Sequence, residues 1–338
     1  MSIAAAEIEM AERHDAAGRH DDAIDCLARA TQRGDVEAKT RLAKRLIVGD
    51  RAPLLMREGA VFMREAAIEG GAEAAALLAV LAAAGLGGRQ DWPRALELAQ
   101  LAAARGWQPA AEQLEVLASL SAPRADAASR GRVPPPIPLH DDPSVRLFPS
   151  FLTDEVCAWL IERSRGRLVR ARVYDAATKT DVVSEKRTNS SASFNLMETD
   201  LVHLMVQTRI SAATGLPFAQ MEGATVLHYA PGEEISNHYD FVDPSMPGYE
   251  EEVRTRGERV MTFLVYLNDD YDGGETEFPR LGIRHKGRRG EGLSFINALP
   301  DGTPDRRTWH AGRPPARNEK WILSQFIRNR PVVPLYEG

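Results

Sequence analysis

A 36-residue spacing in the first third of the chain is the feature that most constrains its fold. Gly34, Gly70 and Gly106 repeat at this interval, and Gly49 and Gly85 share it. Small or apolar residues keep the same register: Ala30, Ala66 and Ala102; Ala38, Ala74 and Ala110; Leu42, Leu78 and Leu114. Small residues let paired helices approach closely, and glycine can end a helix with a positive φ. The period predicts stacked helical hairpins over residues 1–120.

The sequence changes in character after this region. The stretch "SAPRADAASRGRVPPPIP" contains a Pro-Pro-Pro run that favours extended geometry, which predicts a semi-rigid linker over 121–138. Residues 139–338 then form a second domain. Within it, "FLTDEVCAWLIERSR" predicts a helix with Thr153 as its N-cap, and "DLVHLMVQTRISAATG" predicts another that ends at Gly215.

Strand signals dominate the rest of the second domain. The segments "GATVLHYA", "RVMTFLVYLN", "EGLSFINA" and "KWILSQFIRN" carry alternating or β-branched apolar residues, with turn chemistry such as "DGG" between them. Several short strands after helices predict a β-sandwich or barrel backed by helices.

Composition and charge narrow the functional classes. The formal net charge is −6 and the pI is near 5.8, which argues against general affinity for nucleic acid or an anionic membrane. The two cysteines cannot form a disulfide framework or a zinc ribbon, so a reducing compartment is expected. No stretch has the composition of a signal peptide or the length of a membrane span. We therefore expect a soluble, cytoplasmic protein.

A His-x-Asp pattern follows the first strand-like segment. In "APGEEISNHYDFVDP", His238 and Asp240 are two residues apart, so in an extended chain both side chains project from one face. Among the other histidines, only His310 also lies in a loop that leads into a strand. Two histidines and one carboxylate leave three positions open on an octahedral ion, which is the facial triad of non-haem Fe(II) oxygenases. Lys320 begins the next strand, and a buried cation there would need an anion such as a dicarboxylate co-substrate.

The same segments resemble a known enzyme family. "FLTDEVCAWLIE", "RTNSSASF", "GATVLHYAPGEEISNHYD", "RVMTFLVYLNDDYDGGETEFP" and "TWHAGRPPARNEKW" are similar, in this order, to the prolyl 4-hydroxylase branch of the Fe(II)/2-oxoglutarate dioxygenases, over about residues 145–330. This resemblance implies a double-stranded β-helix (jelly-roll) core with flanking helices. In the first domain, "GLGGRQDWPRALELAQLAAARGWQPA" resembles a Sel-one-like repeat, a relative of the tetratricopeptide repeat.

The resemblance to the dioxygenases implies roles for individual residues. His238, Asp240 and His310 would be the catalytic iron ligands, and Lys320 would pair with the distal carboxylate of 2-oxoglutarate. Tyr229 would hydrogen-bond the same carboxylate. Thr276 is a further expected co-substrate contact, with an ordinary turn threonine as the alternative.

Two more residues match family positions near the peptide groove, namely Glu222 and Trp321; a solvated acid at a strand edge is the alternative for Glu222. The chain also departs from the family at three positions that we expect near the reaction chamber. Ile235 stands where a second tyrosine is common, His228 where an arginine is common, and Arg313 where a cysteine is frequent.

The implied reaction is hydroxylation of an unactivated C–H bond, coupled to conversion of 2-oxoglutarate and O2 into succinate and carbon dioxide, with ascorbate as an associated reductant. We expect a proline side chain, or another side chain, in a protein or peptide as the target, held by the repeats. The alternatives are a free amino acid or small metabolite, or an adaptor whose repeats bind a partner while the oxygenase fold is inactive. The repeats themselves either bind a partner or only support the second domain.

Overall fold

The computed structural model describes residues 2–86, 89–121, 133–175, 180–244, 247–299 and 301–332, with the side chains of 121, 173–175, 180 and 181 left out. The chain divides into two compact units. We call the first the repeat unit; it comprises Met1–Glu115 together with Asn195–Leu204. The second, the sheet unit, comprises Val116–Phe194 and Met205–Leu335. Most of the predicted linker, 122–132, lies outside the described residues.

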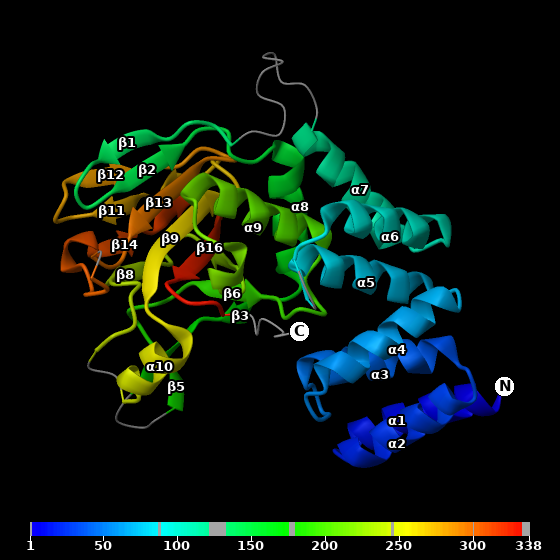
Figure 1. Ribbon diagram of the computed structural model, residues 1–338. Helices are drawn as coiled ribbons and strands as arrows, with labels where there is room; N and C mark the ends of the chain where they lie inside the picture. The colour runs from blue at the N-terminus through cyan, green and yellow to red at the C-terminus, as the bar shows by residue number, and fades with distance from the viewer. Residues whose placement is uncertain are drawn as a thin grey trace. The chain divides into compact units, whose positions relative to one another are not determined.

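Helical hairpins build the repeat unit, as the 36-residue period predicts (Figure 1). Its helices are α1 (Ile3–Ala16), α2 (His20–Gln32), α3 (Val36–Val48), α4 (Met56–Ile68), α5 (Ala72–Ala84), α6 (Trp92–Ala104) and the first part of α7 (Gln108–Ser121). Gly34, Gly70 and Gly106 have φ values of 82°, 105° and 88°, in the left-handed region that favours glycine.

The small residues of the period form the contacts between these helices. Ala30, Ala66 and Ala102 are each 0% exposed. The core that contains Ala66 and Ala102 also includes Met197, with Leu196 packed against it. The backbone N–H of Leu201 donates to Gln113 Oε1 at 3.1 Å. A segment some 80 residues downstream in the sequence therefore completes the packing of the repeat unit.

Two antiparallel sheets form the core of the sheet unit. The eight-stranded sheet has the order β1-β2-β13-β9-β16-β7-β6-β3 and the four-stranded sheet the order β12-β11-β14-β8; β10 pairs with β15, and β4 with β5. The strands are β1 (Ile137–His140), β2 (Val145–Phe148), β3 (Val169–Arg170), β4 (Arg172–Asp175), β5 (Thr180–Val183), β6 (Ser190–Ser193), β7 (Thr225–Tyr229), β8 (Ile235–His238), β9 (Arg259–Tyr266), β10 (Asp272–Gly273), β11 (Thr276–Phe278), β12 (Ile283–His285), β13 (Gly292–Ile296), β14 (His310–Gly312), β15 (Pro315–Arg317) and β16 (Lys320–Arg328).

One apolar cluster joins the two sheets. It contains Leu227, Leu264 and Ile322 from the larger sheet and Ile235 and Phe278 from the smaller one. Two sheets that share one core in this way make the jelly-roll architecture expected from the sequence. The predicted fold class, helical hairpins followed by a β-sheet core with flanking helices, is confirmed.

Helices flank the sheets where the sequence predicts them. Helix α8 (Asp154–Arg165) begins after Thr153, whose side chain accepts a hydrogen bond from the Val156 N–H. Helix α9 (Leu201–Thr214) is followed by Gly215 with φ 71°. Helix α10 (Tyr249–Arg256) and the short 3-10 helices η2 (Phe218–Gln220) and η3 (Arg306–Thr308) also belong to the sheet unit. Within the described residues, no helix combines the length and the apolar composition needed to cross a membrane.

Candidate active site

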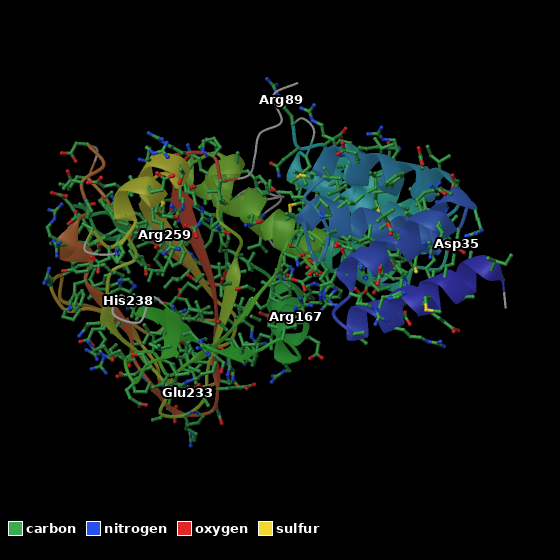
Figure 2. The ribbon with its side chains drawn as sticks, turned by 90° about the horizontal axis from the view of Figure 1, so that it is seen from below. Asp35, Arg89, Arg167, Glu233, His238 and Arg259 are labelled. Carbon is green, nitrogen blue, oxygen red and sulfur yellow. The ribbon has the colours of Figure 1, made fainter. Side chains whose placement is uncertain are left out.

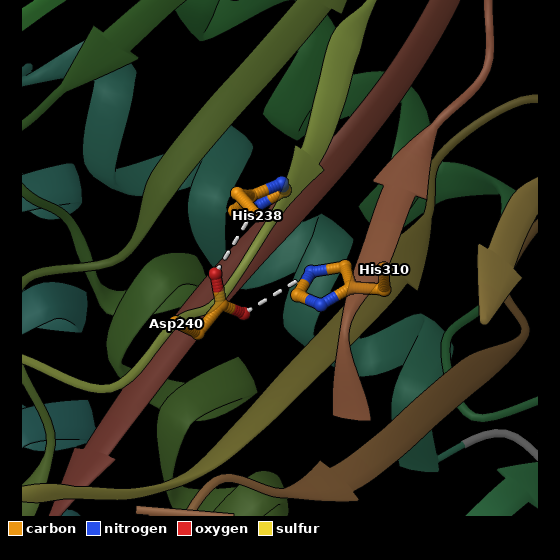
Figure 3. A group of neighbouring side chains, drawn as sticks. All are labelled: His238, Asp240 and His310. Atoms are coloured by element: carbon orange, nitrogen blue, oxygen red, sulfur yellow. Dashed lines mark ion pairs between the residues drawn. The ribbon is translucent and has the colours of Figure 1, made fainter. Parts of the chain in front are cut away.

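The predicted triad meets where β8 and β14 run side by side. The two strands are antiparallel, and His310 is the register partner of His238. Asp240 lies between the two imidazoles: its Oδ1 is 3.2 Å from His238 Nε2, and its Oδ2 is 3.5 Å from His310 Nε2 (Figure 3). The ligand atoms of the three residues all lie within 4.8 Å of one another. The structure therefore brings together the three side chains that the sequence predicts.

Backbone carbonyls orient both imidazoles. His238 Nδ1 lies 2.9 Å from the Ser236 carbonyl oxygen, and His310 Nδ1 lies 3.0 Å from that of Thr308. A carbonyl oxygen can only accept, so each Nδ1 carries the hydrogen and each Nε2 presents its lone pair toward Asp240. This is the arrangement by which proteins fix the tautomer of a metal-binding histidine.

The protonation states also suit a metal. Burial lowers the pKa of His310 to about 4, so its imidazole is neutral near pH 7. Burial acts to raise the pKa of Asp240, but the hydrogen bond from the Thr262 hydroxyl favours the ionised carboxylate and acts to lower it. Thr262 donates to Asp240 Oδ2 at 2.8 Å and accepts from Asn297 Nδ2 at 2.9 Å. Two imidazoles and a carboxylate form a donor set for a divalent cation such as Fe(II).

A cavity of about 230 Å³ opens beside the triad, and Lys320 lies in its wall. Lys320 is 0% exposed, and its Nζ has no hydrogen-bond partner among the described residues. Burial lowers the pKa of this amine to about 7. A buried amine without a counter-ion, facing a cavity, fits a site for an anionic ligand such as the distal carboxylate of 2-oxoglutarate.

Tyr229 and Thr276 line the same cavity. Tyr229 on β7 is the register partner of Lys320 on β16, and the Lys320 Nζ lies 4.7 Å from the centre of its ring. The Thr276 hydroxyl accepts a hydrogen bond from the Tyr266 hydroxyl at 2.8 Å, which leaves its own hydrogen available. The structure thus places all three predicted co-substrate residues around one space.

Glu222 and Trp321, which we expected near a substrate, do not line this cavity. Trp321 follows Lys320 on the strand, so it faces the other side of the sheet, where its ring lies 4.5 Å from that of His228. Glu222 is engaged by two arginines, Arg259 at 2.7 Å and Arg328 at 2.6 Å. The structure places Trp321 behind the sheet and Glu222 against Arg259, an arginine that lines the cavity.

The three departures from the family pattern have different consequences. Ile235 lines the cavity. His228 faces away from it and hydrogen-bonds Glu319 at 3.0 Å. Arg313 is ion-paired with Glu277 and does not line the cavity. Only Ile235 therefore changes the chamber itself, contrary to the expectation for the other two.

Sequence reasoning missed several cavity-lining side chains, among them Arg187, Arg259 and Phe326. Figure 2 labels Arg259 and His238, both in the sheet unit. Phe326 shares a strand face with Lys320 because the two are an even number of residues apart. This alternation was a usable signal for Phe326. For Arg187, the one feature of the sequence that could have indicated a place at the cavity is its position in the "RTNSSASF" segment, which resembles the family.

The polar segment 243–260, which follows the His-x-Asp pattern, contains helix α10. Glu252 of this helix accepts from Arg328 Nη2 at 2.7 Å, and Arg328 is 1% exposed. Helix α10 is therefore fixed to the sheet by a buried guanidinium. The two residues 245 and 246 lie outside the described residues.

Comparison with known proteins agrees with this site. The profile of the "2OG-Fe(II) oxygenase superfamily" matches residues 224–328. "Probable prolyl 4-hydroxylase 9" of Arabidopsis thaliana is 30% identical over 208 residues, which cover 56% of this chain and 69% of that protein. "Prolyl 4-hydroxylase 5" of the same plant is 32% identical over 206 residues, covering 55% and 68%.

Solved structures are similar to each part of the chain. A viral collagen prolyl hydroxylase from Paramecium Bursaria Chlorella virus-1 has 27% identity and a TM-score of 0.42, covering 54% of this chain and 95% of its own. A Sel1 repeat protein from Oxalobacter formigenes has 20% identity and a TM-score of 0.33, covering 35% and 50%.

The triad, the buried lysine and the relatives agree on one chemistry. The residues of the cavity fit the two groups on which that family depends, a divalent iron and a dicarboxylate. The chain belongs to the 2OG-Fe(II) oxygenase superfamily, in its prolyl 4-hydroxylase branch, and is a dioxygenase that uses Fe(II) and 2-oxoglutarate.

Proposed function

We propose that the protein hydroxylates a proline side chain within a peptide or protein. The observation that carries this proposal is the buried amine of Lys320, which has no described partner and faces the same cavity as the triad. An inactive fold would gain nothing from keeping a buried cation beside three converging metal ligands, because an unpaired buried charge is destabilising. The relatives named prolyl 4-hydroxylases supply the target class.

Each residue has a defined share in this reaction. His238, Asp240 and His310 would hold Fe(II), which supplies the redox chemistry that couples O2 and 2-oxoglutarate to hydroxylation of a C–H bond. Lys320, with the Tyr229 hydroxyl, binds and orients the distal carboxylate of 2-oxoglutarate. The apolar walls exclude water from the reacting atoms.

Hydroxylation of a peptide can be tested directly. The purified protein is loaded with Fe(II) without oxygen, then mixed with oxygen, 2-oxoglutarate and proline-containing peptides. We expect succinate and hydroxyproline in equal amounts, and neither product above background with matched peptides that carry alanine in place of proline. Free proline serves as the small-molecule arm. Hydroxylation of free proline with no turnover of any peptide would overturn the peptide target.

We propose further that the repeats hold the target. The support is a set of exposed apolar side chains in and before α4: Leu54 is 62%, Val61 46% and Ile68 76% exposed. The positions one period away from Val61 are Asp25 and Glu97, so the fold itself does not require an apolar residue there. Such residues are typical of a binding surface.

The recruitment proposal predicts an effect that depends on substrate length. Val61→Glu with Ile68→Glu should weaken hydroxylation of a long proline-containing polypeptide and leave a short peptide unaffected. Met10→Glu, at another exposed apolar position of the repeats (42% exposed), is the control. Equal loss with both lengths, or with neither, would contradict recruitment by this surface.

A further inference from the structure

The charges that line the active-site cavity are unequal. Three cationic side chains face it, Arg187, Arg259 and Lys320, and the one acid among the lining residues is Asp240. Cations in a partly enclosed space need compensation, because a low-dielectric surrounding makes an unbalanced charge costly. Two of these three cations have a compensating group, in the protein or in the bound cofactors, and the third does not.

Arg259 is compensated within the protein. Its Nε and Nη2 donate to the two carboxylate oxygens of Glu222 at 2.7 and 2.9 Å, a bidentate pair. Arg328 donates to Glu222 at 2.6 Å and to Glu252 at 2.7 Å. Arg259 therefore has its counter-ion, Glu222, inside the protein and needs none from a ligand.

Lys320 and Asp240 are compensated once the cofactors are bound. Fe(II) carries two positive charges and 2-oxoglutarate two negative ones, and the single charges of Lys320 and Asp240 cancel each other. The metal and co-substrate end of the cavity is then neutral. Arg187 remains as the cation without a compensating acid.

The backbone of Arg187 is paired with the metal-binding strand. Its backbone forms a bridge with Ile235 of β8, and the neighbouring Thr188 N–H donates to the Glu234 carbonyl oxygen at 2.8 Å. Its Nε donates to Oδ1 of Asn189, which is 0% exposed, at 3.4 Å. Within the described part of the chain, the two terminal nitrogens of the guanidinium make no hydrogen bond and no ion pair. They form an oriented, unused pair of donors.

We propose that Arg187 binds a carboxylate of the substrate, so that the preferred target carries an acidic group within one or two residues of the hydroxylated position. This inference rests on the proposed function and narrows its substrate class. A neutral peptide carbonyl could accept a hydrogen bond from Arg187 but would leave its charge uncompensated. A carboxylate matches both the charge and the two-donor geometry of a guanidinium.

The carboxylate could come from an aspartate or glutamate side chain or from the chain terminus. The test therefore uses blocked peptides with one central proline and a single Asp or Asn at each of the two positions on either side. A second pair has the proline last, with a free or an amidated C-terminus. Affinity is measured by calorimetry with Mn(II) and 2-oxoglutarate, without turnover, and hydroxylation is measured separately with Fe(II).

We expect one Asp position, or the free C-terminus, to improve affinity about tenfold over its neutral counterpart. Arg187→Gln should abolish this preference by weakening only the acidic peptide. Arg187→Glu should reverse it in favour of a peptide with Lys at the same position. Lys186→Gln, which removes an exposed charge from the adjacent residue, should leave the preference intact.

The possible results distinguish failure of the Arg187 role from failure of the proline target. Equal affinity for every acidic and neutral pair overturns the role of Arg187, whether or not the peptides are hydroxylated. A loss of 2-oxoglutarate affinity in Arg187→Gln as large as that in Lys320→Ala would also overturn it, by placing Arg187 at the co-substrate. Tight binding of acidic peptides that are never hydroxylated would support Arg187 and refute the proline target.

Discussion

The two units of this protein bury different kinds of side chain. In the repeat unit, the contacts between helices are made by small apolar residues such as Ala30, Ala66 and Ala102, all fully buried. The sheet unit instead buries charged and polar groups, including Lys320, Arg328 and Asp240. The repeat unit also buries Lys39, but together with its ion-pair partner Glu69 at 2.6 Å, so packing and internal pairing explain its interior. In the sheet unit, the Lys320 amine has no partner among the described residues and becomes favourable only with a ligand, so the contrast separates residues kept for stability from a residue kept for chemistry.

The largest expected effect comes from removing a metal ligand. His310→Ala should lower Fe(II) affinity and 2-oxoglutarate turnover by about a hundredfold or more, because two ligands cannot replace the triad. The fold should persist, since an uncompensated set of metal ligands adds little to stability. Iron binding is measured by anaerobic titration, and folding by circular dichroism.

His228→Ala is the matched control for this prediction. His228 is a histidine of the same sheet unit that faces away from the cavity. Its variant should keep both iron affinity and turnover. Unchanged iron affinity in His310→Ala would contradict the metal site.

The next effect concerns Lys320. Lys320→Met removes a buried amine but keeps an apolar chain of similar length, so it should stabilise the ligand-free protein by about 2 kcal/mol. It should also abolish the stabilisation that 2-oxoglutarate gives the wild type. Thermal unfolding with and without 2-oxoglutarate measures both effects. If Lys320→Met is stabilised by 2-oxoglutarate as strongly as the wild type, Lys320 does not bind it.

The same lysine predicts a pH dependence. Burial lowers its pKa from 10.5 to about 7 in the folded state, so between these values the unfolded state binds more protons. The stability of the ligand-free protein should therefore rise with pH across this range. Affinity for 2-oxoglutarate should fall as pH rises above about 7, because the neutral amine must first gain a proton. Lys320→Met should lose both trends; a flat 2-oxoglutarate affinity in the wild type would contradict the assignment.

A smaller effect is expected in the packing of the repeats. Ala66→Leu adds volume at a fully buried contact and should destabilise the repeat unit by about 1–3 kcal/mol. Val61→Leu, on the exposed face of the same helix, is the control and should have no effect. Hydrogen exchange of α4 reports the change, while Fe(II) affinity should stay constant. A loss of iron affinity in Ala66→Leu would show that the division between the two interiors is wrong.

The smallest effect is local. Thr153→Ala removes the side-chain oxygen that caps helix α8 and should lower stability by about 1 kcal/mol. Thr153→Ser keeps the cap and should restore it. Denaturant unfolding measures the difference, and equal stability of the two variants would contradict the capping role.

The sequence predicts best what depends on local spacing. The 36-residue period, the N-cap at Thr153 and the His-x-Asp pattern all rest on short-range geometry, and the structure contains each of them. Alternation along β16 would also have excluded Trp321 from the face that carries Lys320.

Contacts between side chains far apart in the chain cannot be predicted from local patterns in the sequence. The engagement of Glu222 by Arg259 and Arg328 joins residues far apart in the chain, and no local pattern marks them as partners. Helix α10 has no readable signal for a related reason: its polar sequence has no apolar face, and it is held in place by the buried Arg328. Such contacts become visible only when the strands are placed side by side.

The membership of Asn195–Leu204 in the repeat unit has a consequence for biosynthesis. Leu196 and Met197 complete a core whose other members lie between Val36 and Ala110. On the ribosome, the helices α1–α7 emerge first, followed by β1–β6, before these two residues leave the exit tunnel. The part of the repeat core that Leu196 and Met197 cover therefore stays exposed to solvent until more than half of the chain has been made.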